Sequence, residues 1–318
     1  MSRHILSVFM CGLIVLVVFT VFVGCSSSSL DDKSTPTVGL TPQPVTIIDA
    51  LERTLSFGDV PKTIATISPT ATEMLYAAGG TSALRDRAST FPKVVQSVSD
   101  VGSAYDPSIE TILASNPDLV VIEALTQARF LPVLGQSGLK VMAVKAETVD
   151  DVKNGILNLG KIIQQEDIAS AKVREIEEKL TAVRNDDNRS VLLLISDQDQ
   201  NLYAARPESY TGLIAGILGM ENKAAGLADS GPYPGFAMIS LEAILIANPD
   251  VIVTISPAPE PAPRLSETLA HIPPFAGLKA MQNGNVIEAD VELFLQAPGP
   301  RIADAVEFLK ESLAAKSD

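Results

Sequence analysis

The sequence predicts an α/β protein of two pseudo-symmetric lobes, in which central parallel sheets are flanked by helices and one long helix joins the lobes. The first observation behind this is an internal repeat: "SIETILASNPDLVV" at residues 108–121 returns as "SLEAILIANPDVIV" at residues 240–253. The second is that short apolar runs alternate with helical patterns, which is typical of parallel sheets covered on both faces. With 318 residues, 46% of them hydrophobic, the chain is long enough for two cores of ordinary size.

The N-terminus has the pattern of an export segment. An apolar run from Ile5 to Val23 follows Arg3, and "VFVGC", which ends at Cys25, resembles the lipobox of bacterial lipoproteins. We therefore predict a signal peptide at residues 1–24 and lipidation of Cys25; an uncleaved anchor helix is the alternative, because the run is close to the roughly 20 residues that a membrane span requires. Both place the rest of the chain at the extracytoplasmic side of the cell membrane, in the periplasm or at the cell surface.

Residues 25–45 are rich in Ser, Thr and Pro and are predicted to form an extended tether. The N-terminal lobe is assigned to residues 46–165. Its first clear strand is "TIATIS", which ends at Ser68, and a helix follows in which Thr70 and Glu73 have the spacing of a capping box. A short helix within residues 106–117 and buried strands in "DLVVI" and "LKVMAV" complete the pattern.

The bridging helix is predicted at residues 166–184. Val173, Ile176, Leu180 and Val183 recur there at the spacing of one helical face, and the helix could reach about 28 Å. A single stiff helix would limit how far the two lobes can hinge.

The C-terminal lobe, residues 185–318, repeats the order of elements. Strands are predicted at residues 190–196 and 285–289, with a helix at residues 209–219 and the repeated unit between them. In both copies Asn-Pro should end the helix and Asp should begin the next strand.

The composition argues against several kinds of function. A net charge of −14 disfavours nucleic acid as a partner. The chain has no G-x-S-x-G motif, P-loop or dinucleotide fingerprint, and His271 is the only histidine beyond the predicted signal peptide. Neither a catalytic triad nor a histidine-rich metal site is therefore expected, and we predict no enzyme activity, no cofactor and no metal site.

Several stretches together resemble one family. "ATISPTATEMLYAAGG", "VGSAYDPSIETILASNPDLVVI", "GLKVMAV" and "PGPRIADAVEFL" are similar to the substrate-binding lipoproteins of ABC importers for cobalamin and iron-siderophore complexes. The resemblance covers the chain from Lys62 onward. It implies the class III fold of periplasmic binding proteins, whose lobes share one helical backbone, and a monomer that delivers a metal chelate to a permease dimer with a cytoplasmic ATPase.

The resemblance also implies roles for the repeated glutamates. Such proteins dock on the permease through one exposed glutamate per lobe, and the matching residues are Glu110 and Glu242. The alternative for both is ordinary placement in the first turn of a helix, where a carboxylate is stabilised by a few tenths to about 1 kcal/mol.

The ligand stays open between a corrinoid, a hydroxamate-type iron complex and haem. Aromatic walls are expected from both lobes. By position in the family pattern the candidates are Phe91, Tyr105, Tyr203 and Phe236, with Arg206, Glu292 and Phe294 as weaker ones. The chain has no tryptophan, unlike typical cobalamin binders. A lipid-anchored sensor or surface enzyme on the same fold is the alternative function.

Overall fold

The computed structural model describes residues 44–184, 186–258 and 261–316. All of them belong to one compact unit. The predicted signal peptide, Cys25 and nearly all of the predicted tether lie outside the described residues. The last residue assigned to the tether, Val45, already belongs to a strand.

The first lobe is built on three parallel strands in the order β3-β6-β7. These are β3 (Ile64–Thr66), β6 (Leu119–Glu123) and β7 (Val141–Val144). Alternate side chains of β6 enter two different clusters: Leu119 and Val121 pack on one face, and Val120 and Ile122 on the other. Because both faces are buried, the strand is a continuous apolar run, as the sequence predicted.

Helices cover both faces of this sheet. One face is covered by α1 (Pro69–Ala77) and α5 (Val149–Ile162), and the other by α2 (Ile109–Ser115) and α4 (Leu131–Gln136). The remaining elements are two hairpins and three short turns of helix: β1 (Val45–Ile48) with β2 (Thr54–Phe57), β4 (Gly102–Ser103) with β5 (Asp106–Pro107), η1 (Lys93–Ser97), α3 (Ala124–Gln127) and η2 (Ala128–Phe130).

The sheet of the second lobe is mixed, which differs from the expected parallel sheet. Its strands are β8 (Ser190–Ser196), β9 (Leu202–Ala205), β10 (Glu221–Asn222), β11 (Phe236–Ile239), β12 (Val251–Ile255) and β13 (Val286–Ala289). The order is β11-β9-β8-β12-β13, with β10 beside the start of β8, and β9 runs antiparallel to both neighbours. The physical reason is a tight turn after β8, in which Asp197 Oδ1 accepts hydrogen bonds from the backbone N–H groups of Asp199 and Asn201.

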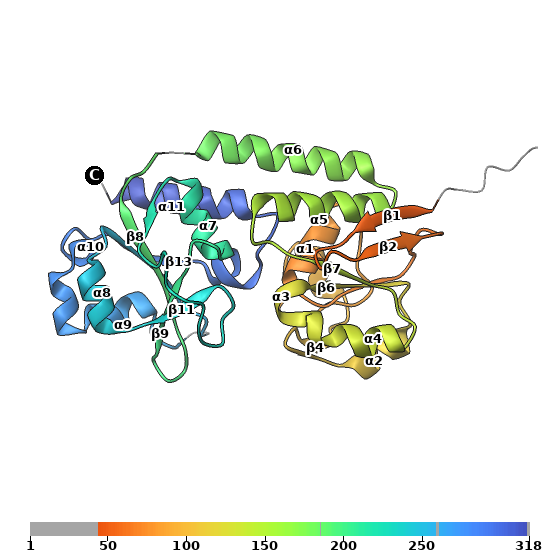
Figure 1. Ribbon diagram of the computed structural model, residues 1–318, viewed down its shortest axis with the longest axis horizontal. Helices are drawn as coiled ribbons and strands as arrows, with labels where there is room; N and C mark the ends of the chain where they lie inside the picture. The colour runs from red at the N-terminus through yellow and green to blue at the C-terminus, as the bar shows by residue number, and fades with distance from the viewer. Residues whose placement is uncertain (1–43, 185, 259–260, 317–318) are drawn as a thin grey trace, which may run out of the picture. The chain divides into compact units, whose positions relative to one another are not determined.

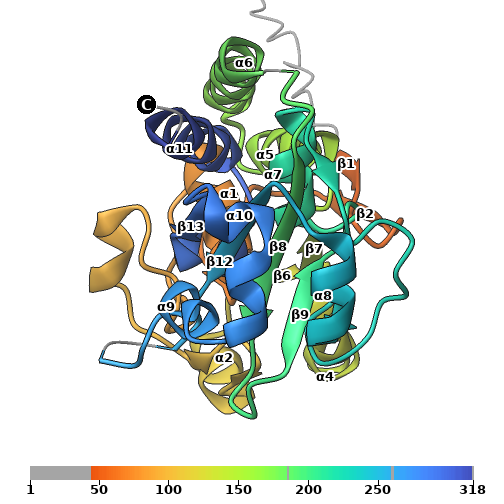
Figure 2. The ribbon, with the colours of Figure 1, turned by 90° about the vertical axis from the view of Figure 1, so that its left-hand side faces the viewer.

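Helices again lie on both faces of this sheet (Figure 2). One face carries α8 (Leu241–Ala247), α9 (Leu265–Ala270), η3 (Pro273–Gly277) and α10 (Lys279–Gln282). The other face carries α7 (Tyr210–Ile217), the π-helical turn η4 (Glu292–Gln296) and α11 (Ile302–Ala315).

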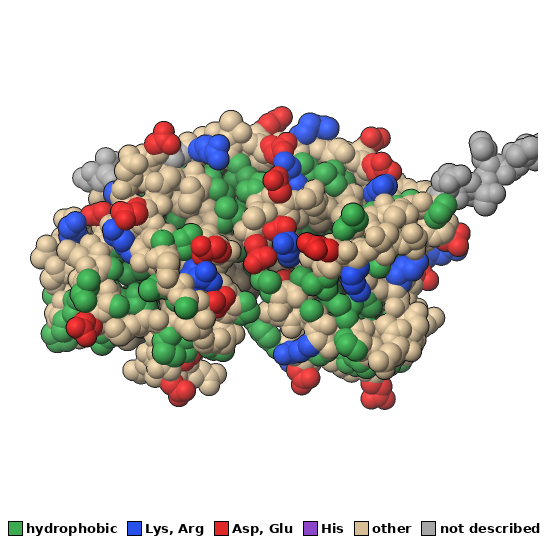
Figure 3. All heavy atoms as spheres, viewed as in Figure 1, with side chains coloured by type: hydrophobic (Ala, Val, Ile, Leu, Met, Phe, Trp, Pro, Cys, Tyr) green, Lys and Arg blue, Asp and Glu red, His purple; other side chains and the backbone are tan. Residues whose placement is uncertain are grey.

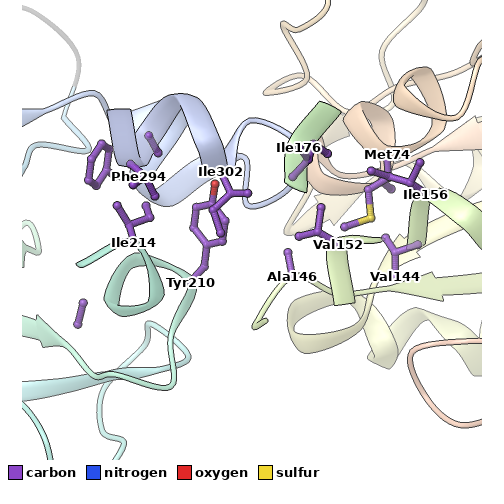
Figure 4. Close-up of a cluster of buried hydrophobic side chains, with 14 of the residues drawn as sticks. Met74, Val144, Ala146, Val152, Ile156, Ile176, Tyr210, Ile214, Phe294 and Ile302 are labelled. Carbon is purple, nitrogen blue, oxygen red and sulfur yellow. The ribbon is translucent and has the colours of Figure 1, made fainter. Parts of the chain in front are cut away.

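The bridging helix is confirmed. It is α6 (Glu166–Val183), which ends within one residue of the predicted range. It packs against α5 of the first lobe and α11 of the second (Figure 1). Its buried Val173 and Ile176 belong to a hydrophobic cluster that includes Met74 and Ile156 of the first lobe and continues into the second (Figure 4). The two lobes therefore share one core.

The repeat forms the same local structure twice. Ser108 and Ser240 are the N-caps of α2 and α8, and each side chain accepts a hydrogen bond from the backbone N–H three residues on. Asn116 and Asn248 end the two helices in the left-handed conformation, with φ of 44° and 39°. Asparagine tolerates this conformation better than most residues do, which explains why it stands before the proline in both copies.

The repeated aspartate ties each unit to a neighbouring strand. Asp118 Oδ2 accepts hydrogen bonds from the backbone N–H groups of Lys62 and Thr63 just before β3, both at 2.8 Å. Asp250 Oδ2 accepts in the same way from Ser190 at the start of β8, at 2.9 Å. Both aspartates thus set the register between the repeated unit and the parallel strand beside it.

The predicted capping box in α1 is wrong. The N-cap is Ser68, whose side chain accepts a hydrogen bond from Ala71 N, and Thr70 lies inside the helix with Pro69 before it. Proline is favoured at the first helical position, so the helix begins two residues earlier than the capping-box spacing suggested. Glu73 points to the second lobe instead.

Candidate functional site

The lobes meet at a cluster of five residues that we call the lobe junction: Glu73, Thr90 and Phe91 from the first lobe, and Glu292 and Arg301 from the second. Arg301 Nε donates to both carboxylate oxygens of Glu73 at 3.0 Å, and its guanidinium lies 4.5 Å from the centre of the Phe91 ring. Thr90 Oγ1 donates to Glu292 Oε1 at 3.0 Å.

Burial changes the pKa of one carboxyl group at the lobe junction. The Glu73 side chain is almost fully buried, and this burial raises its pKa from 4.5 to about 7 against the opposing effect of Arg301. Two predicted ligand residues, Phe91 and Glu292, are therefore partners in a contact between lobes. Phe91 also lines a cavity of about 520 Å³ between α1, α6 and α11.

Three aromatic side chains gather in the second lobe. The Tyr203 and Tyr233 rings meet edge to face at 5.3 Å, and Tyr233 meets Phe236 at 6.3 Å. The Tyr203 hydroxyl donates to Asp197 Oδ2 at 2.9 Å. Tyr203 and Phe236 are buried, whereas Tyr233 is only half-buried, so Tyr233 is the accessible ring of the three.

Tyr233 is not among the ligand residues predicted from the sequence. It stands in "GPYPGF", three residues before the predicted Phe236, and an aromatic side chain in a Gly-Pro loop was the available signal. The loop approaches Tyr203 closely: a Cβ on Gly231, whose φ is +92°, would lie 2.3 Å from the Tyr203 ring.

The first lobe presents Tyr105. Its side chain is 64% exposed in the hairpin between β4 and β5, and the Arg129 guanidinium donates to its carbonyl oxygen. Partial desolvation and the nearby Glu123 carboxylate raise the pKa of Tyr105. Desolvation, Asp197 and Tyr105 together raise the pKa of Tyr233.

A pocket of about 730 Å³ opens beside Tyr233 in the second lobe. It lies at the carboxyl ends of β8 and β12, where open α/β sheets usually bind their ligands. Polar side chains from three loops line it together with apolar ones, and they include Asp197, Asn201, Ser240, Ser256, Met238, Leu265 and Thr268. The mixture fits a largely apolar ligand with a few polar groups.

Two weaker candidates are placed elsewhere. Arg206 forms ion pairs with Glu208 at 3.2 Å and Asp229 at 3.4 Å, so it anchors the loop that carries Tyr233. Phe294 is fully buried in the core, where its ring meets Phe308 at 5.8 Å. Its position in the family pattern placed it near the ligand, but packing between η4 and α11 keeps its ring away from any surface.

The two predicted docking residues are exposed in the first turns of their helices. Neither the Glu110 carboxylate nor the Glu242 carboxylate has a hydrogen bond or ion pair with another residue in the part of the chain that the structure describes. Figure 3 shows acidic and basic side chains interspersed on one face of the molecule.

The described residues offer neither a metal-binding cluster nor a helix that could span a membrane. Within residues 44–184, 186–258 and 261–316, no group of three or more His, Cys, Asp or Glu side chains could hold a metal ion. Over the same residues, no helix combines the length and the apolar character needed to cross a membrane.

Comparisons with known proteins agree with this architecture. A cobalamin-binding protein of Halobacterium salinarum is 24% identical over 268 residues, which cover 82% of this chain and 72% of that protein. YvrC of Bacillus subtilis (strain 168), described as an uncharacterized ABC transporter substrate-binding lipoprotein, is 26% identical over 287 residues, which cover 85% of each chain.

A solved structure confirms the predicted two-lobed α/β fold. The petrobactin-binding protein YclQ from Bacillus subtilis superposes with a TM-score of 0.74 at 19% identity, over 85% of this chain and 99% of that one. The family model for periplasmic binding proteins matches residues 64–293. With most of its length matched in this way, the chain belongs to the periplasmic binding protein family.

Proposed function

We propose that this protein is the extracytoplasmic solute-binding subunit of an ABC importer, which captures a metal chelate between its lobes and delivers it to the permease. The observation that carries the proposal is the pocket of about 730 Å³ at the carboxyl ends of β8 and β12, which the half-buried Tyr233 lines together with apolar and polar side chains. Aromatic rings provide large apolar contact areas that suit a macrocycle or a bulky chelate.

The charges near this site favour a neutral or cationic chelate. The Asp197 carboxylate lines the pocket, and Arg206 is already paired with Glu208 and Asp229. An anionic ligand would be repelled by Asp197 and would have to compete with Glu208 and Asp229 for the Arg206 guanidinium. Cobalamin and hydroxamate-type ferric complexes therefore rank above haem, whose propionates are negative. The cobalamin-binding relative of Halobacterium salinarum takes a ligand of this kind.

Delivery would use the two exposed glutamates. Each would meet a basic group on one of two permease subunits, and exposed ion pairs worth roughly 1 kcal/mol each suit transient docking. The protein would work as a monomer, held to the outer face of the cytoplasmic membrane by a lipid on Cys25. A sensor or a surface enzyme would have no use for matched glutamates on both lobes, so this repeat favours the importer.

A thermal-shift series tests the proposal. The chain from Ser26 onward is heated with cobalamin, cobinamide, haem and several ferric siderophores, because a ligand that binds only the folded state stabilises it by RT ln(1 + [L]/Kd). We expect a rise of several degrees with a corrinoid or a ferric chelate. A chain that none of these ligands stabilises would contradict chelate capture and favour the sensor or enzyme.

A further inference from the structure

The two repeated helices bury different faces, although their sequences are nearly the same. Each buries one residue completely at the same position, Ile112 in α2 and Ile244 in α8. The partly buried neighbours differ: α2 turns Ile109 and Leu113 toward the first lobe. In α8 the equivalent residues, Leu241 and Leu245, are 45% and 36% exposed.

The two helices bury different faces because of the residues on the other side of the buried isoleucine. In α8 this side carries Ala243 and Ala247, which pack on the core of the second lobe. In α2 the same positions hold Thr111 and Ser115, which are exposed. Because hydroxyl side chains favour water and alanine does not, the two helices are rotated about their axes relative to their lobes by roughly a quarter of a turn.

The rotation changes the surroundings of the docking glutamate. At 100° per residue, the exposed face of α8 presents Leu241, Leu245, Glu242 and Ile246 side by side in that order. Ile246 is 77% exposed, and its equivalent in α2 is Ala114. The carboxylate of Glu242 thus stands between two exposed large apolar side chains, Leu245 and Ile246, while Glu110 stands between Leu113, which packs on the core of the first lobe, and the small Ala114.

We propose that the two docking surfaces are not equivalent, and that α8 provides an apolar one that fits a basic side chain set in an apolar surface of the permease. This inference rests on the proposed function. Large apolar side chains that are exposed together in a soluble protein mark interaction sites. Charge complementarity fixes the kind of partner, because Glu242 has no ion pair in the part of the chain that the structure describes and would need a cation once water leaves the contact.

A second copy of this chain is the poorer occupant. A symmetric dimer through α8 would bring the same surface of both copies together, and with it both Glu242 carboxylates. Two like charges without partners would oppose such a contact. A permease surface that carries a basic side chain meets no such repulsion.

The test compares matched positions in the two helices. Full-length chain is titrated against the permease and ATPase complex whose ATP hydrolysis it stimulates, reconstituted in lipid nanodiscs. Ile246→Ser should weaken docking about tenfold, as expected for losing one well-buried aliphatic side chain. The equivalent change in α2, Ala114→Ser, should leave docking within twofold. Ile246 is exposed and does not line the pocket, so both variants should bind chelate as the unchanged chain does.

Salt separates the apolar contribution from the charged one. Raising the ionic strength should weaken docking of the unchanged chain and of Ile246→Ser by the same factor, while Glu242→Gln should be less sensitive to salt. Equal docking of Ile246→Ser and the unchanged chain would overturn the inference alone. Failure of the unchanged chain to stimulate any importer complex would overturn the proposed function as well. A dimer in solution that Ile246→Ser dissolves would assign the surface to a second copy instead.

Discussion

The Glu73 carboxylate of the first lobe is paired with the Arg301 guanidinium of the second, 228 residues further along the chain. The Phe91 ring covers the guanidinium, and Arg301 also lies 3.8 Å from Glu292. The Glu73 carboxylate therefore fixes the position of one lobe against the other, although its spacing from Thr70 had assigned it to a helix cap.

This pair should make stability depend on pH near neutrality. Burial raises the pKa of Glu73 from 4.5 to about 7, so the folded state holds the proton more tightly than the unfolded state. The contribution of this group to the free energy of unfolding is therefore largest below pH 4.5 and falls as the pH rises to about 7, by up to about 3 kcal/mol.

Urea denaturation at pH 5 and pH 7.5 checks this prediction. Glu73→Gln should remove most of the loss in the free energy of unfolding between pH 5 and pH 7.5, because glutamine has no proton to release. Glu178→Gln, on the exposed side of α6, is the matched control and should keep the loss. Identical pH profiles for Glu73→Gln and the unchanged chain would show that Glu73 does not titrate in this range.

Glycine substitution should affect stability differently at the left-handed C-cap asparagines of the two lobes. Asn116→Ala and Asn248→Ala should each lower the free energy of unfolding by about 1 kcal/mol, because alanine is strained at positive φ. Asn116→Gly should recover the free energy of unfolding that the alanine variant loses. Asn248→Gly should recover only part of it, because Asn248 Oδ1 also accepts a hydrogen bond from Lys279 N at 3.0 Å. Denaturation midpoints of the four variants measure the contrast, and an equal rescue in both lobes would contradict it.

Docking should be separable from ligand capture. Glu110→Ala with Glu242→Ala should leave chelate affinity unchanged, because both carboxylates are exposed and none of their atoms lines the pocket. Uptake of the chelate by cells should fall at least tenfold, since both ion pairs with the permease would be lost. Radiolabelled uptake and binding assays on the same variant provide the comparison. Uptake that stays at the level of the unchanged chain would exclude these glutamates as docking residues.

The accessible and the buried aromatic residues should behave in opposite ways. Tyr105→Ala and Tyr233→Ala should each weaken binding of the identified chelate about tenfold, because Tyr233 lines the pocket and the proposal places the exposed Tyr105 ring against the ligand from the first lobe; Tyr105→Ala should leave stability nearly unchanged. Phe294→Ala should lower the free energy of unfolding by about 3 to 5 kcal/mol, since it leaves a cavity in the core. Calorimetric titration and denaturation distinguish the two effects. Loss of affinity in Phe294→Ala at full stability would place Phe294 in the site after all.

Features that depend on local sequence were predictable. The spacing of Val173, Ile176 and Val183 defined α6, and the repeat located α2 and α8 with their ends before Asn-Pro, because periodicity and helix-ending residues act over a few positions. The strand β8 matched its predicted range for the same reason. The hairpin of β1 and β2 was missed, since its two short strands offer only weak alternation before the first buried strand.

Features that depend on distant residues were not predictable. Nothing near Glu73 indicates Arg301, and nothing near β9 indicates that the turn at Asp197 would reverse the strand direction. Among the aromatic residues, sequence position could not separate the accessible Tyr233 from the buried Phe294, because packing between distant elements decides which ring meets solvent.

The core that passes through α6 has a consequence for how the protein melts. Because buried side chains of α5, α6 and α11 form one continuous cluster, neither lobe can open fully without exposing apolar surface of the other. The lobes should therefore unfold in one calorimetric transition rather than two. A ligand that touches only one of them would then raise the melting temperature of both.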